Sequence, residues 1–461
     1  MGYEHLTVFR EYDIRGLAAE ELDDRFCYDF GLVLAAYFKG HGLGRVLLGR
    51  DNRLSSPRIR DRITEGLTAG GCDVADIGEV TTPLFYYARI HLGIEAGVMI
   101  TASHNPPEYN GFKIARGPAT IYGEEIQRLR RMLIEGAGRP ASAPGAVTAH
   151  DVAEAYLGML AEKLELKRGL RVAVDCGNGT AGPYAVEFLR RLGCEVVPLY
   201  CDSDGRFPHH EPDPVRPANL RDLQQRVLAA GADLGLAFDG DGDRLGVVDE
   251  KAEIIWGDKL MVLFWREILA RHPGAVALIE VKCSDLLVEE VKRLGGVPVF
   301  TRTGHSLIKA KMRELGALFA GEMSGHMFFA DEYYGFDDAF YAAGRLLRLV
   351  AASDLPLSAM LAGLPVYYST AETRIDCPDT AKERVVRSIR DAFAATNEVI
   401  DVDGARIVFP DGWGLVRASN TQPVIVARCE AKTPEGLERI KALLGEALAS
   451  HPEVGPVRWE E

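Results

Sequence analysis

The chain has 461 residues, of which 47% are hydrophobic and 26% charged, and 67 acidic against 53 basic side chains give a formal net charge of −14. This composition is that of a globular protein, and at about 100–200 residues per domain the length predicts three or four domains. The acidic balance argues against general binding to nucleic acid or to a membrane surface. It does not exclude an anionic ligand, because a local cluster of basic groups and backbone N–H groups can hold a phosphate.

The cysteines and the N-terminus favour a cytoplasmic protein. Eight cysteines are scattered without a C-x-x-C pair, which is typical of reduced thiols and lacks the spacing of a zinc site. The opening residues, MGYEHLTVFREYDIRG, contain no apolar signal segment. Apolar runs such as 31–38 and 260–265 are far shorter than the roughly 18 residues of a membrane span. We therefore expect a soluble, cytoplasmic protein.

Short β-branched runs alternate with amphipathic stretches along the chain, which is typical of an α/β protein. The pattern predicts a strand at 45–49 and a helix at 57–69, and later a strand at 171–175 followed by a glycine turn and a helix. Further strands are expected at 96–103, 234–238, 245–249, 275–281 and 317–323.

Changes in composition mark the expected domain boundaries. The segment 136–147 is rich in Gly, Pro, Ala and Ser, and further joins lie near 250–256 and 361–370. We predict domains over 1–146, 147–252, 253–366 and 367–461, the last of them a small α+β unit. The three leading segments are similar in length, which permits a duplicated unit without showing one.

Two glycine-rich segments imitate well-known binding motifs. GNGTAG (177–182) fits the dinucleotide pattern G-x-G-x-x-G after a strand, and Asp202 lies where a ribose-binding acid would. No nicotinamide site accompanies it, so a tight turn leading into a helix is the better interpretation. DGDGDRLGVVDE (239–250) approaches an EF-hand loop, but Arg244 replaces the required glycine and the flanks are strands.

Three acidic residues in that second segment predict a metal site. Asp239, Asp241 and Asp243 alternate with glycines after a buried strand, so an extended backbone points them to one side. At about 4 Å, each pair of carboxylates repels by roughly 4 kcal/mol at an effective dielectric of about 20, and a divalent cation removes that penalty. Hard oxygen ligands favour Mg²⁺. The alternative is a solvated Asp-Gly turn.

A second loop presents a candidate reactive serine. In TASHNP (101–106) an apolar strand delivers Ser103 at its exit, a common place for a reactive side chain in α/β folds. The alternative is a hydroxyl that only caps the loop. Ser103 lacks the flanking glycines of a hydrolase nucleophile elbow. A phosphorylated Ser103 would carry about −1.5 to −2 charges, which a metal held by the three aspartates would neutralise. The forked guanidinium of Arg244 could bind the phosphate oxygens.

Two more polar loops follow predicted strands. In GEMSGH (321–326), Glu322 and Ser324 share a side as acceptor and donor for sugar hydroxyls, and His326 could move protons. RASNTQP (417–423) offers a dense set of phosphate donors. A cap with a buried histidine and an ordinary polar turn are the respective alternatives.

With these four loops in chain order, and with FREYDIRG (9–16) before them, the sequence resembles the α-D-phosphohexomutases, most closely the bacterial phosphomannomutase/phosphoglucomutase branch. The likeness covers essentially the whole chain. It implies an α/β fold of four domains around a central cleft, three related α/β domains with mixed sheets and a smaller C-terminal α+β domain. In order, these would carry the phosphoserine, metal-binding, sugar-recognition and phosphate-binding loops.

The resemblance also implies roles for particular residues. Ser103 matches the phosphorylated serine and, with Asp239, Asp241 and Asp243, a ligand of one Mg²⁺ per chain. The other implied catalytic residues are Arg15, His104, Lys113, Arg244 and His326. The implied substrate-binding residues are Tyr12, Lys282, His305, Glu322, Ser324, Arg417, Ser419, Asn420 and Thr421.

The implied reaction is reversible phosphoryl transfer between the 1- and 6-positions of mannose or glucose phosphates, through a phosphoserine enzyme and a bound 1,6-bisphosphate. The implied partner is a small hexose phosphate, with no nucleic acid and no membrane, and the chain would be a monomer or weak dimer. Met323 fits glucose and mannose phosphates better than glucosamine phosphate, and Gln422 replaces a small residue common in the last loop. A phosphoglucosamine mutase and a metal-dependent sugar phosphatase remain as alternatives, beside a catalytically silent phosphosugar-binding regulator.

Overall fold

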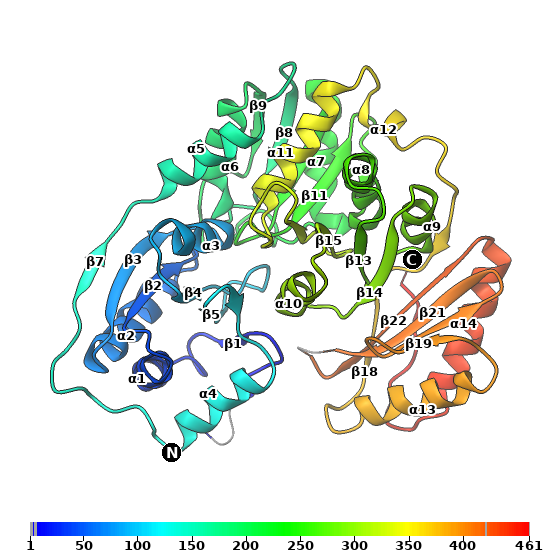
Figure 1. Cartoon of the computed structure of the whole chain (residues 1–461). Helices are drawn as coiled ribbons and strands as arrows, with labels where there is room; N and C mark the ends of the chain where they lie inside the picture. Colours follow the sequence, from blue (N-terminus) through cyan, green and yellow to red (C-terminus); the bar gives the residue numbers. More distant parts are fainter. Residues whose placement is uncertain (1–2, 4–6, 420–421, 461) are drawn as a thin grey trace.

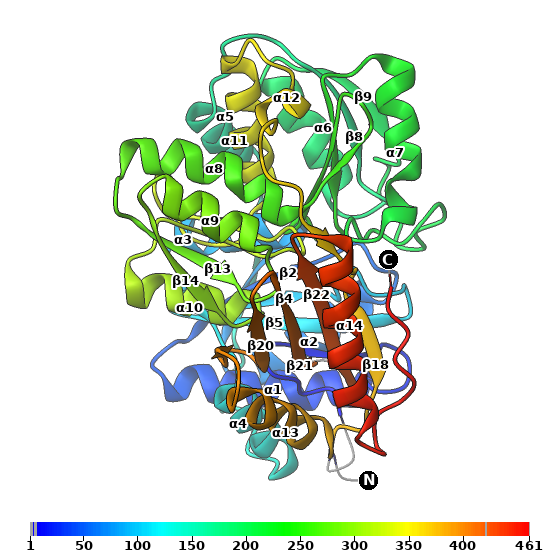
Figure 2. The ribbon, with the colours of Figure 1, turned by 90° about the vertical axis from the view of Figure 1, so that its right-hand side faces the viewer.

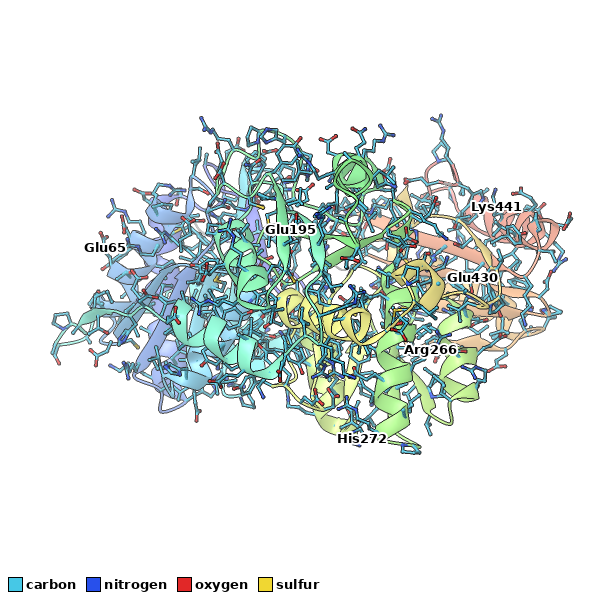
Figure 3. The ribbon with its side chains drawn as sticks, turned by 90° about the horizontal axis from the view of Figure 1, so that it is seen from above. Glu65, Glu195, Arg266, His272, Glu430 and Lys441 are labelled. Atoms are coloured by element: carbon cyan, nitrogen blue, oxygen red, sulfur yellow. The ribbon has the colours of Figure 1, made fainter. Side chains whose placement is uncertain are left out.

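Four sheets organise the computed structural model, which describes residue 3 and residues 7–419 and 422–460. Each sheet with its helices forms one domain, and the four domains follow one another in an arc in chain order (Figure 1). Seen from above, the first domain with Glu65 and the fourth with Lys441 lie at opposite ends (Figure 3). The chain is therefore an α/β protein of four domains, as predicted.

The first domain has a mixed sheet of order β1-β5-β4-β2-β3-β7, with β6 beside β5. Its strands are β1 (Ile14–Leu17), β2 (Arg45–Arg50), β3 (Asp73–Glu79), β4 (Ala96–Ile100), β5 (Tyr109–Arg116), β6 (Ala119–Thr120) and β7 (Val147–Ala149). Its helices are α1 (Asp24–Gly40), α2 (Ser56–Ala69), α3 (Thr82–His91) and α4 (Glu124–Ile134).

The second and third domains are built on sheets of order β12-β11-β10-β8-β9 and β14-β13-β15-β16. The second contains β8 (Arg171–Asp175), β9 (Glu195–Leu199), β10 (Leu234–Phe238), β11 (Leu245–Asp249), β12 (Ile254–Ile255), α5 (Ala153–Lys163), α6 (Ala181–Arg191) and α7 (Pro217–Ala230). The third contains β13 (Val276–Glu280), β14 (Val297–Thr301), β15 (Phe319–Gly321), β16 (Met327–Phe329), α8 (Gly257–Arg271), α9 (Asp285–Arg293), α10 (His305–Leu315), α11 (Ala339–Ala352) and α12 (Leu357–Met360).

The fourth domain has an antiparallel sheet of order β17-β22-β21-β20-β19, with β18 beside β22. It contains β17 (Tyr368–Ser369), β18 (Thr373–Asp376), β19 (Val399–Ile400), β20 (Ala405–Phe409), β21 (Gly412–Ala418), β22 (Val424–Ala431), α13 (Lys382–Ala394) and α14 (Pro434–Ala449). The two helices pack on one face of this sheet, as Figure 2 shows for α14 over β21 and β22.

The first three sheets repeat one strand order. In each, the first core strand lies between the second and third, all three are parallel, and the fourth pairs antiparallel with the third. The repeat runs β3-β2-β4-β5, then β9-β8-β10-β11, then β14-β13-β15-β16. The similar lengths of the leading segments thus correspond to one repeated topology, and the loop between the third and fourth core strands has the same place in each domain.

Most expected elements have the predicted type, and the differences lie at their ends. The strands at 171–175, 234–238 and 245–249 have the predicted bounds. The strand expected at 96–103 ends at Ile100, because the chain then leaves the sheet as the loop that carries Ser103. Similarly, the strand expected at 317–323 covers only 319–321 before the next loop begins.

Helix starts follow ordinary capping chemistry. The side chains of Asp23, Thr81, Ser284, Asp338 and Thr433 each accept a hydrogen bond from a backbone N–H in the first turn of the following helix. These bonds satisfy donors that have no partner inside the helix.

One hydrophobic core runs through the first three domains, which also have separate clusters of their own, and the fourth domain has its own core. On β2, Val46 and Leu48 pack with α1 and α2, whereas Leu47 belongs to the core on the opposite face. That second core extends through the second and third domains, and the fourth domain has its own core between its sheet and α13 and α14. Among the described residues, no helix is long and apolar enough to cross a bilayer.

Helices α1 and α2 cross at a pair of glycines, which generates a stability prediction. A Cβ on Gly66 would lie 2.7 Å from the Gly31 Cα and also clash with the Tyr28 carbonyl oxygen. Because these neighbours are backbone atoms, we expect Gly66→Ala to reduce the free energy of unfolding by about 1–3 kcal/mol. Denaturant titration followed by circular dichroism measures it.

The matched control is Gly158→Ala in α5, where a Cβ meets nothing within 4 Å. There the alanine is expected to stabilise the helix by about 0.5–1 kcal/mol. A Gly66→Ala protein as stable as the control would contradict the close crossing of α1 and α2.

Candidate active site

Equivalent loops of the first three domains bring the predicted site together. Ser103 lies between β4 and β5, the three aspartates lie between β10 and β11, and Glu322 lies between β15 and β16. In each case a buried strand ends and the chain turns back antiparallel. The repeated topology thus gives three chemically different loops the same position on their sheets.

Arg53 holds the Ser103 loop in shape. Its guanidinium is fully buried and donates to the carbonyl oxygens of Ser103 (2.9 Å), Asn105 (2.6 Å), Pro106 (2.5 Å) and Tyr109 (3.0 Å). Asp51 accepts from its Nε at 3.1 Å. Ser103 itself has a left-handed backbone with φ of 53°, which is uncommon for a side chain larger than glycine. The rigid guanidinium fork therefore fixes a loop whose conformation costs energy.

The aspartate loop is closed by its own first residue. The Oδ1 atom of Asp239 accepts from the backbone N–H groups of Asp243 and Arg244, each at 3.0 Å. Gly242, with φ of 75°, makes the turn possible. The loop curls back on itself, so that all three carboxylates are buried and one oxygen of each lies within 4.8 Å of the others.

The serine loop and the aspartate loop are in direct contact. The Ser103 hydroxyl donates to Asp239 Oδ2 at 2.8 Å, and both side chains are at most 3% exposed. A Cβ on Gly240 would lie well inside van der Waals contact with the Ser103 carbonyl oxygen. Glycine at position 240 thus permits the backbone approach that places a hydroxyl of the first domain on a carboxylate of the second.

Unsatisfied oxygens make the aspartate cluster suitable for a hard cation. Asp241 Oδ1 is buried without a hydrogen-bond partner among the described residues, and Asp243 Oδ1 lies 3.2 Å from His326 Nε2. Lys113 contacts the other oxygen of each, at 2.8 Å for Asp241, and so offsets one of three negative charges. Burial, then the neighbouring Asp243 and Asp241, raise the pKa of Asp239 well above its usual range. Asp239, Asp241 and Asp243 fit Mg²⁺, which prefers such oxygen ligands.

Two further basic residues lie around Ser103. His104 Nδ1 is 3.0 Å from the Ser103 hydroxyl oxygen. Burial, together with Arg244 and Arg15, lowers the pKa of His104 well below its usual value, so its ring is neutral. Arg15, on β1, donates to Asn105 Oδ1 at 2.6 Å and pairs with Asp13 at 2.6 Å. His104 therefore contacts the Ser103 hydroxyl directly, and Arg15 contacts Asn105, two residues further along the same loop.

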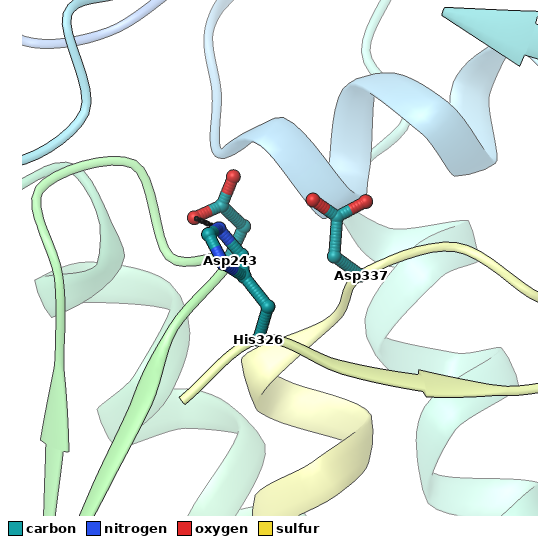
Figure 4. Close-up of side chains that lie close together, drawn as sticks. All are labelled: Asp243, His326 and Asp337. Carbon is teal, nitrogen blue, oxygen red and sulfur yellow. Dashed lines mark ion pairs between the residues drawn. The ribbon is translucent and has the colours of Figure 1, made fainter. Parts of the chain in front are cut away.

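The third-domain loop brings His326 to the aspartates. His326 Nδ1 lies 2.6 Å from Glu322 Oε2, and His326 Nε2 lies 3.2 Å from Asp243 Oδ1. Figure 4 shows His326 directed toward Asp243, with Asp337 on its other side. Burial alone would lower the pKa of His326, but the Asp243 and Glu322 carboxylates raise it to about 9. Arg244 Nε is also 3.3 Å from His326 Nε2.

Glu322 ties this loop to the predicted sugar-binding residues. Its Oε1 atom accepts from the Gly304 N–H at 2.7 Å, and its Oε2 atom accepts from the Ser324 hydroxyl at 3.3 Å. His305, next to Gly304, meets the Tyr12 ring edge to face at 5.5 Å. Although burial raises the pKa of Glu322, its hydrogen bond with His326 and other contacts lower it to about 2, so it is an ionised acceptor.

A second group of predicted residues lies where the third and fourth domains meet. Lys282 pairs with Glu372 at 2.8 Å and with Glu280 at 3.3 Å. Arg417 Nε donates to Asp403 Oδ2 at 2.9 Å, whereas its Nη2 is buried without a hydrogen-bond partner among the described residues. Ser419 Oγ accepts from the Gln422 N–H at 3.2 Å. The predicted Asn420 and Thr421 lie outside the described residues.

Sequence reasoning missed several residues that support these side chains: Arg53, Tyr86, Lys309, Asp337, Glu372 and Asp403. Only one of them carried a usable local signal. Lys309 follows His305 by four residues, and in helix α10 this spacing places both on one face. The others contact site residues that are distant along the chain, in another domain for Tyr86 and Glu372 and in the same domain for Arg53, so spacing does not reveal these contacts.

The segment GNGTAG (177–182), which fits the dinucleotide-binding pattern, forms a contact between the first two domains. Asn178 has φ of 59°, and its carbonyl oxygen accepts from Asn52 Nδ2 at 2.7 Å. Thr180 Oγ1 accepts from the Asn52 N–H at 3.0 Å. A Cβ on Gly179 would approach Gly240. The glycine turn therefore lets the second domain pack closely against the first and against the aspartate loop, as expected of a tight turn.

A buried hydroxyl against clustered carboxylates, among lysine, arginine and histidine, is typical of enzymes that transfer phosphoryl groups with a divalent metal. Family models described as phosphoglucomutase/phosphomannomutase match the chain in four parts: α/β/α domain I over residues 6–135, domain II over 154–253, domain III over 256–368 and the C-terminal domain over 372–446. The matches follow the four domains in chain order.

Individual proteins agree with the family models over the full length. A phosphomannomutase/phosphoglucomutase of Pseudomonas aeruginosa is 44% identical over 96% of this chain and 95% of its own, and a phosphoglucomutase of Neisseria gonorrhoeae is 43% identical over 96% and 97%. The crystal structure of a phosphoglucomutase/phosphomannomutase family protein from Burkholderia thailandensis is 41% identical and superposes with a TM-score of 0.91, covering 98% of this chain and 99% of that one.

The chain belongs to the phosphoglucomutase/phosphomannomutase family, the α-D-phosphohexomutases. It is a phosphohexomutase, as the resemblance implied.

The close approach at Gly240 gives a test of the site geometry. We expect Gly240→Ala to push the two loops apart, because the methyl group meets backbone atoms of Ser103 that cannot rotate away. A displacement of about 1 Å at a phosphoryl-transfer site costs on the order of 100-fold in rate. Steady-state assays of kcat/KM measure the loss, with Mg²⁺ titration as a second readout.

Gly44→Ala is the matched control, because a Cβ there meets nothing within 4 Å. It should keep full activity. Equal activity of the two variants would contradict the view that the site depends on this backbone contact.

Proposed function

We propose that the chain moves a phosphoryl group between the 1- and 6-positions of mannose and glucose phosphates through a phosphorylated Ser103. The observation that supports this most directly is the buried contact between the Ser103 hydroxyl and Asp239 Oδ2 at 2.8 Å. It puts a nucleophilic oxygen at the edge of a cluster that can hold a cation. The names of the relatives, which include both mutase activities, support the choice of sugars.

Asp239, Asp241 and Asp243 would hold one Mg²⁺, with an oxygen of the phosphorylated Ser103 as a further ligand. When bound, the ion neutralises phosphate charge and makes phosphorus more electrophilic. His104 beside Ser103, Arg15 beside Asn105 of the same loop and Lys113 beside Asp241 would be donors for the remaining phosphate oxygens.

His326 is the best candidate for the group that takes the proton of the attacking sugar hydroxyl. Arg15 stays protonated in proteins, and the carboxylates of Asp241 and Asp243 raise the pKa of Lys113 well above its usual value despite its burial. Neither can accept a proton readily. His326, whose pKa the Asp243 carboxylate raises to about 9, would accept one as the neutral ring, and a cation on the aspartates would favour that form by offsetting the carboxylate charge. His326 is buried beside the aspartates and is oriented by Glu322 at 2.6 Å. In the proposed step the sugar oxygen bonds to phosphorus, the bond from phosphorus to Ser103 Oγ breaks, and the hydroxyl proton passes to His326.

The second group of residues would hold the phosphate that does not react. Arg417 offers a buried guanidinium nitrogen without a hydrogen-bond partner among the described residues, and Ser419 lies on the same loop. Glu322, Ser324, His305, Tyr12 and Lys282 would contact the sugar between the two phosphate positions. The bound 1,6-bisphosphate would then turn over and return its other phosphate to Ser103. All eight cysteines, each within the described chain, are free thiols, which agrees with a cytoplasmic enzyme.

The experiment that tests this function combines mass with activity. Intact mass of the purified protein is expected to show one phosphoryl group, absent from Ser103→Ala, because Ser103 is the proposed carrier. Mutase assays with mannose, glucose and glucosamine phosphates should show conversion of the first two and loss of nearly all activity in Ser103→Ala. Alanine is close to serine in size, so Ser103→Ala is expected to fold, and circular dichroism checks its folding.

The same assay separates the rival functions. Release of inorganic phosphate in place of an isomer would indicate a sugar phosphatase, and preference for glucosamine phosphate would indicate a phosphoglucosamine mutase. A fully active Ser103→Ala protein would overturn the proposed phosphoserine mechanism.

A further inference from the structure

Behind the proposed sugar-binding His305 lies a buried charged group that no step above uses. Lys309 is one turn further along α10, on the same face as His305. Tyr86 reaches it from α3 of the first domain, and Asp337 reaches it from the segment before α11 (Figure 4 shows Asp337). All four side chains are buried.

The ammonium group of Lys309 is fully occupied. Its Nζ donates to Asp337 Oδ1 at 2.8 Å, to the Tyr86 hydroxyl oxygen at 3.0 Å and to His305 Nδ1 at 3.2 Å. An ammonium has three donors and no acceptor, so these three contacts use all of its protons. Each partner must therefore accept, and His305 can accept at Nδ1 only if that nitrogen carries no proton.

We propose that Lys309 is a positioning residue that keeps the single ring proton of His305 on Nε2. A neutral imidazole has one N–H and one bare nitrogen, and the contact at one nitrogen decides which is which. With Nδ1 accepting from Lys309, the proton must lie on Nε2. His305 Nε2 is buried and has no hydrogen-bond partner among the described residues, so it can donate to a ligand.

The Asp337 carboxylate is the other group that can decide which nitrogen of His305 carries the proton. Its Oδ2 atom lies 3.7 Å from His305 Nδ1 and has no hydrogen-bond partner among the described residues. Without Lys309, this carboxylate would draw the ring proton to Nδ1 and leave Nε2 bare. Ser306 Oγ is 3.5 Å from Nδ1, but it already contacts Thr120 Oγ1 at 2.6 Å.

The surrounding charges also favour a neutral ring. Burial, then the positive charges of Lys309, Lys113 and His326, lower the pKa of His305 well below its usual value, against an opposing effect of Asp243. Burial lowers the pKa of Lys309, and the ion pair with Asp337 at 2.8 Å opposes this by favouring the ammonium form. These effects thus place a neutral His305 ring beside the ammonium group of Lys309.

For catalysis, the consequence rests on the proposed function, in which His305 contacts the substrate. An Nε2–H can donate to a phosphate oxygen or a sugar oxygen, whereas a bare Nε2 can only accept, so it would repel a phosphate oxygen. Losing one such hydrogen bond to a charged oxygen reduces binding of the transition state on the order of tenfold or more.

The test reads the tautomer directly. Two-dimensional ¹H–¹⁵N long-range spectra of protein labelled at histidine, with His305 assigned by comparison with His305→Gln, show which ring nitrogen carries the proton. We expect Nε2–H in the wild-type protein and a shift of the proton to Nδ1 in Lys309→Met. Tyr86→Phe is the matched control, because it removes a different partner of Lys309 and should keep Nε2–H.

A wild-type His305 protonated at Nδ1 would overturn the proposal even if Lys309→Met failed to fold. So would an unchanged Nε2–H in a folded Lys309→Met. Kinetics adds an independent readout: kcat/KM of Lys309→Met should fall at least tenfold, and that of Tyr86→Phe much less. The spectra need no substrate, so they test the tautomer even if the mutase assay fails. The tautomer proposal and the proposed function can therefore be refuted independently of each other.

Discussion

The contact between the Ser103 hydroxyl and the Asp239 carboxylate is the interaction on which the rest of the site depends. It joins a loop of the first domain to a loop of the second, with both side chains buried. Three carboxylates in one buried turn repel each other, and Lys113 offsets only part of their charge. The molecule therefore holds a buried acidic cluster whose repulsion a bound cation would relieve, next to the hydroxyl that is proposed to carry the phosphate.

One repeated topology explains how distant parts of the chain meet there. The third and fourth core strands of each α/β domain are joined at the same place on the sheet, and these joins carry Ser103, the aspartates and Glu322. Their approach needs small residues and buried clamps at the domain contacts, which Gly240, Gly179 and Arg53 supply. The fourth domain has a separate core and meets the third through buried arginines such as Arg406, which donates to the carbonyl oxygens of Val281 and Cys283.

Much of this could be predicted from local sequence. Apolar runs predicted the buried strands, and alternating Asp and Gly residues predicted the aspartate loop, because both features depend on neighbours along the chain. The position of Ser103 at a strand exit followed in the same way. Arg53 and Asp337 could not be found, because their partners Ser103 and Lys309 lie 50 and 28 residues away and become neighbours only when each domain folds. The contact of Lys309 with Tyr86, 223 residues away, forms only when the domains pack. The segment 177–182 is the opposite case. It fits a binding pattern, but in the structure it is a turn that packs against the first domain.

The most direct measurement of the central claim uses Mn²⁺ in place of Mg²⁺ on the phosphorylated protein. Electron–nuclear double resonance detects phosphorus in the first coordination sphere of the bound Mn²⁺. If the aspartate cluster and the phosphoserine share one ion, a strong ³¹P coupling is expected, and it should vanish in Ser103→Ala with Mn²⁺ still bound. A bound Mn²⁺ without ³¹P coupling in fully phosphorylated protein would contradict the account.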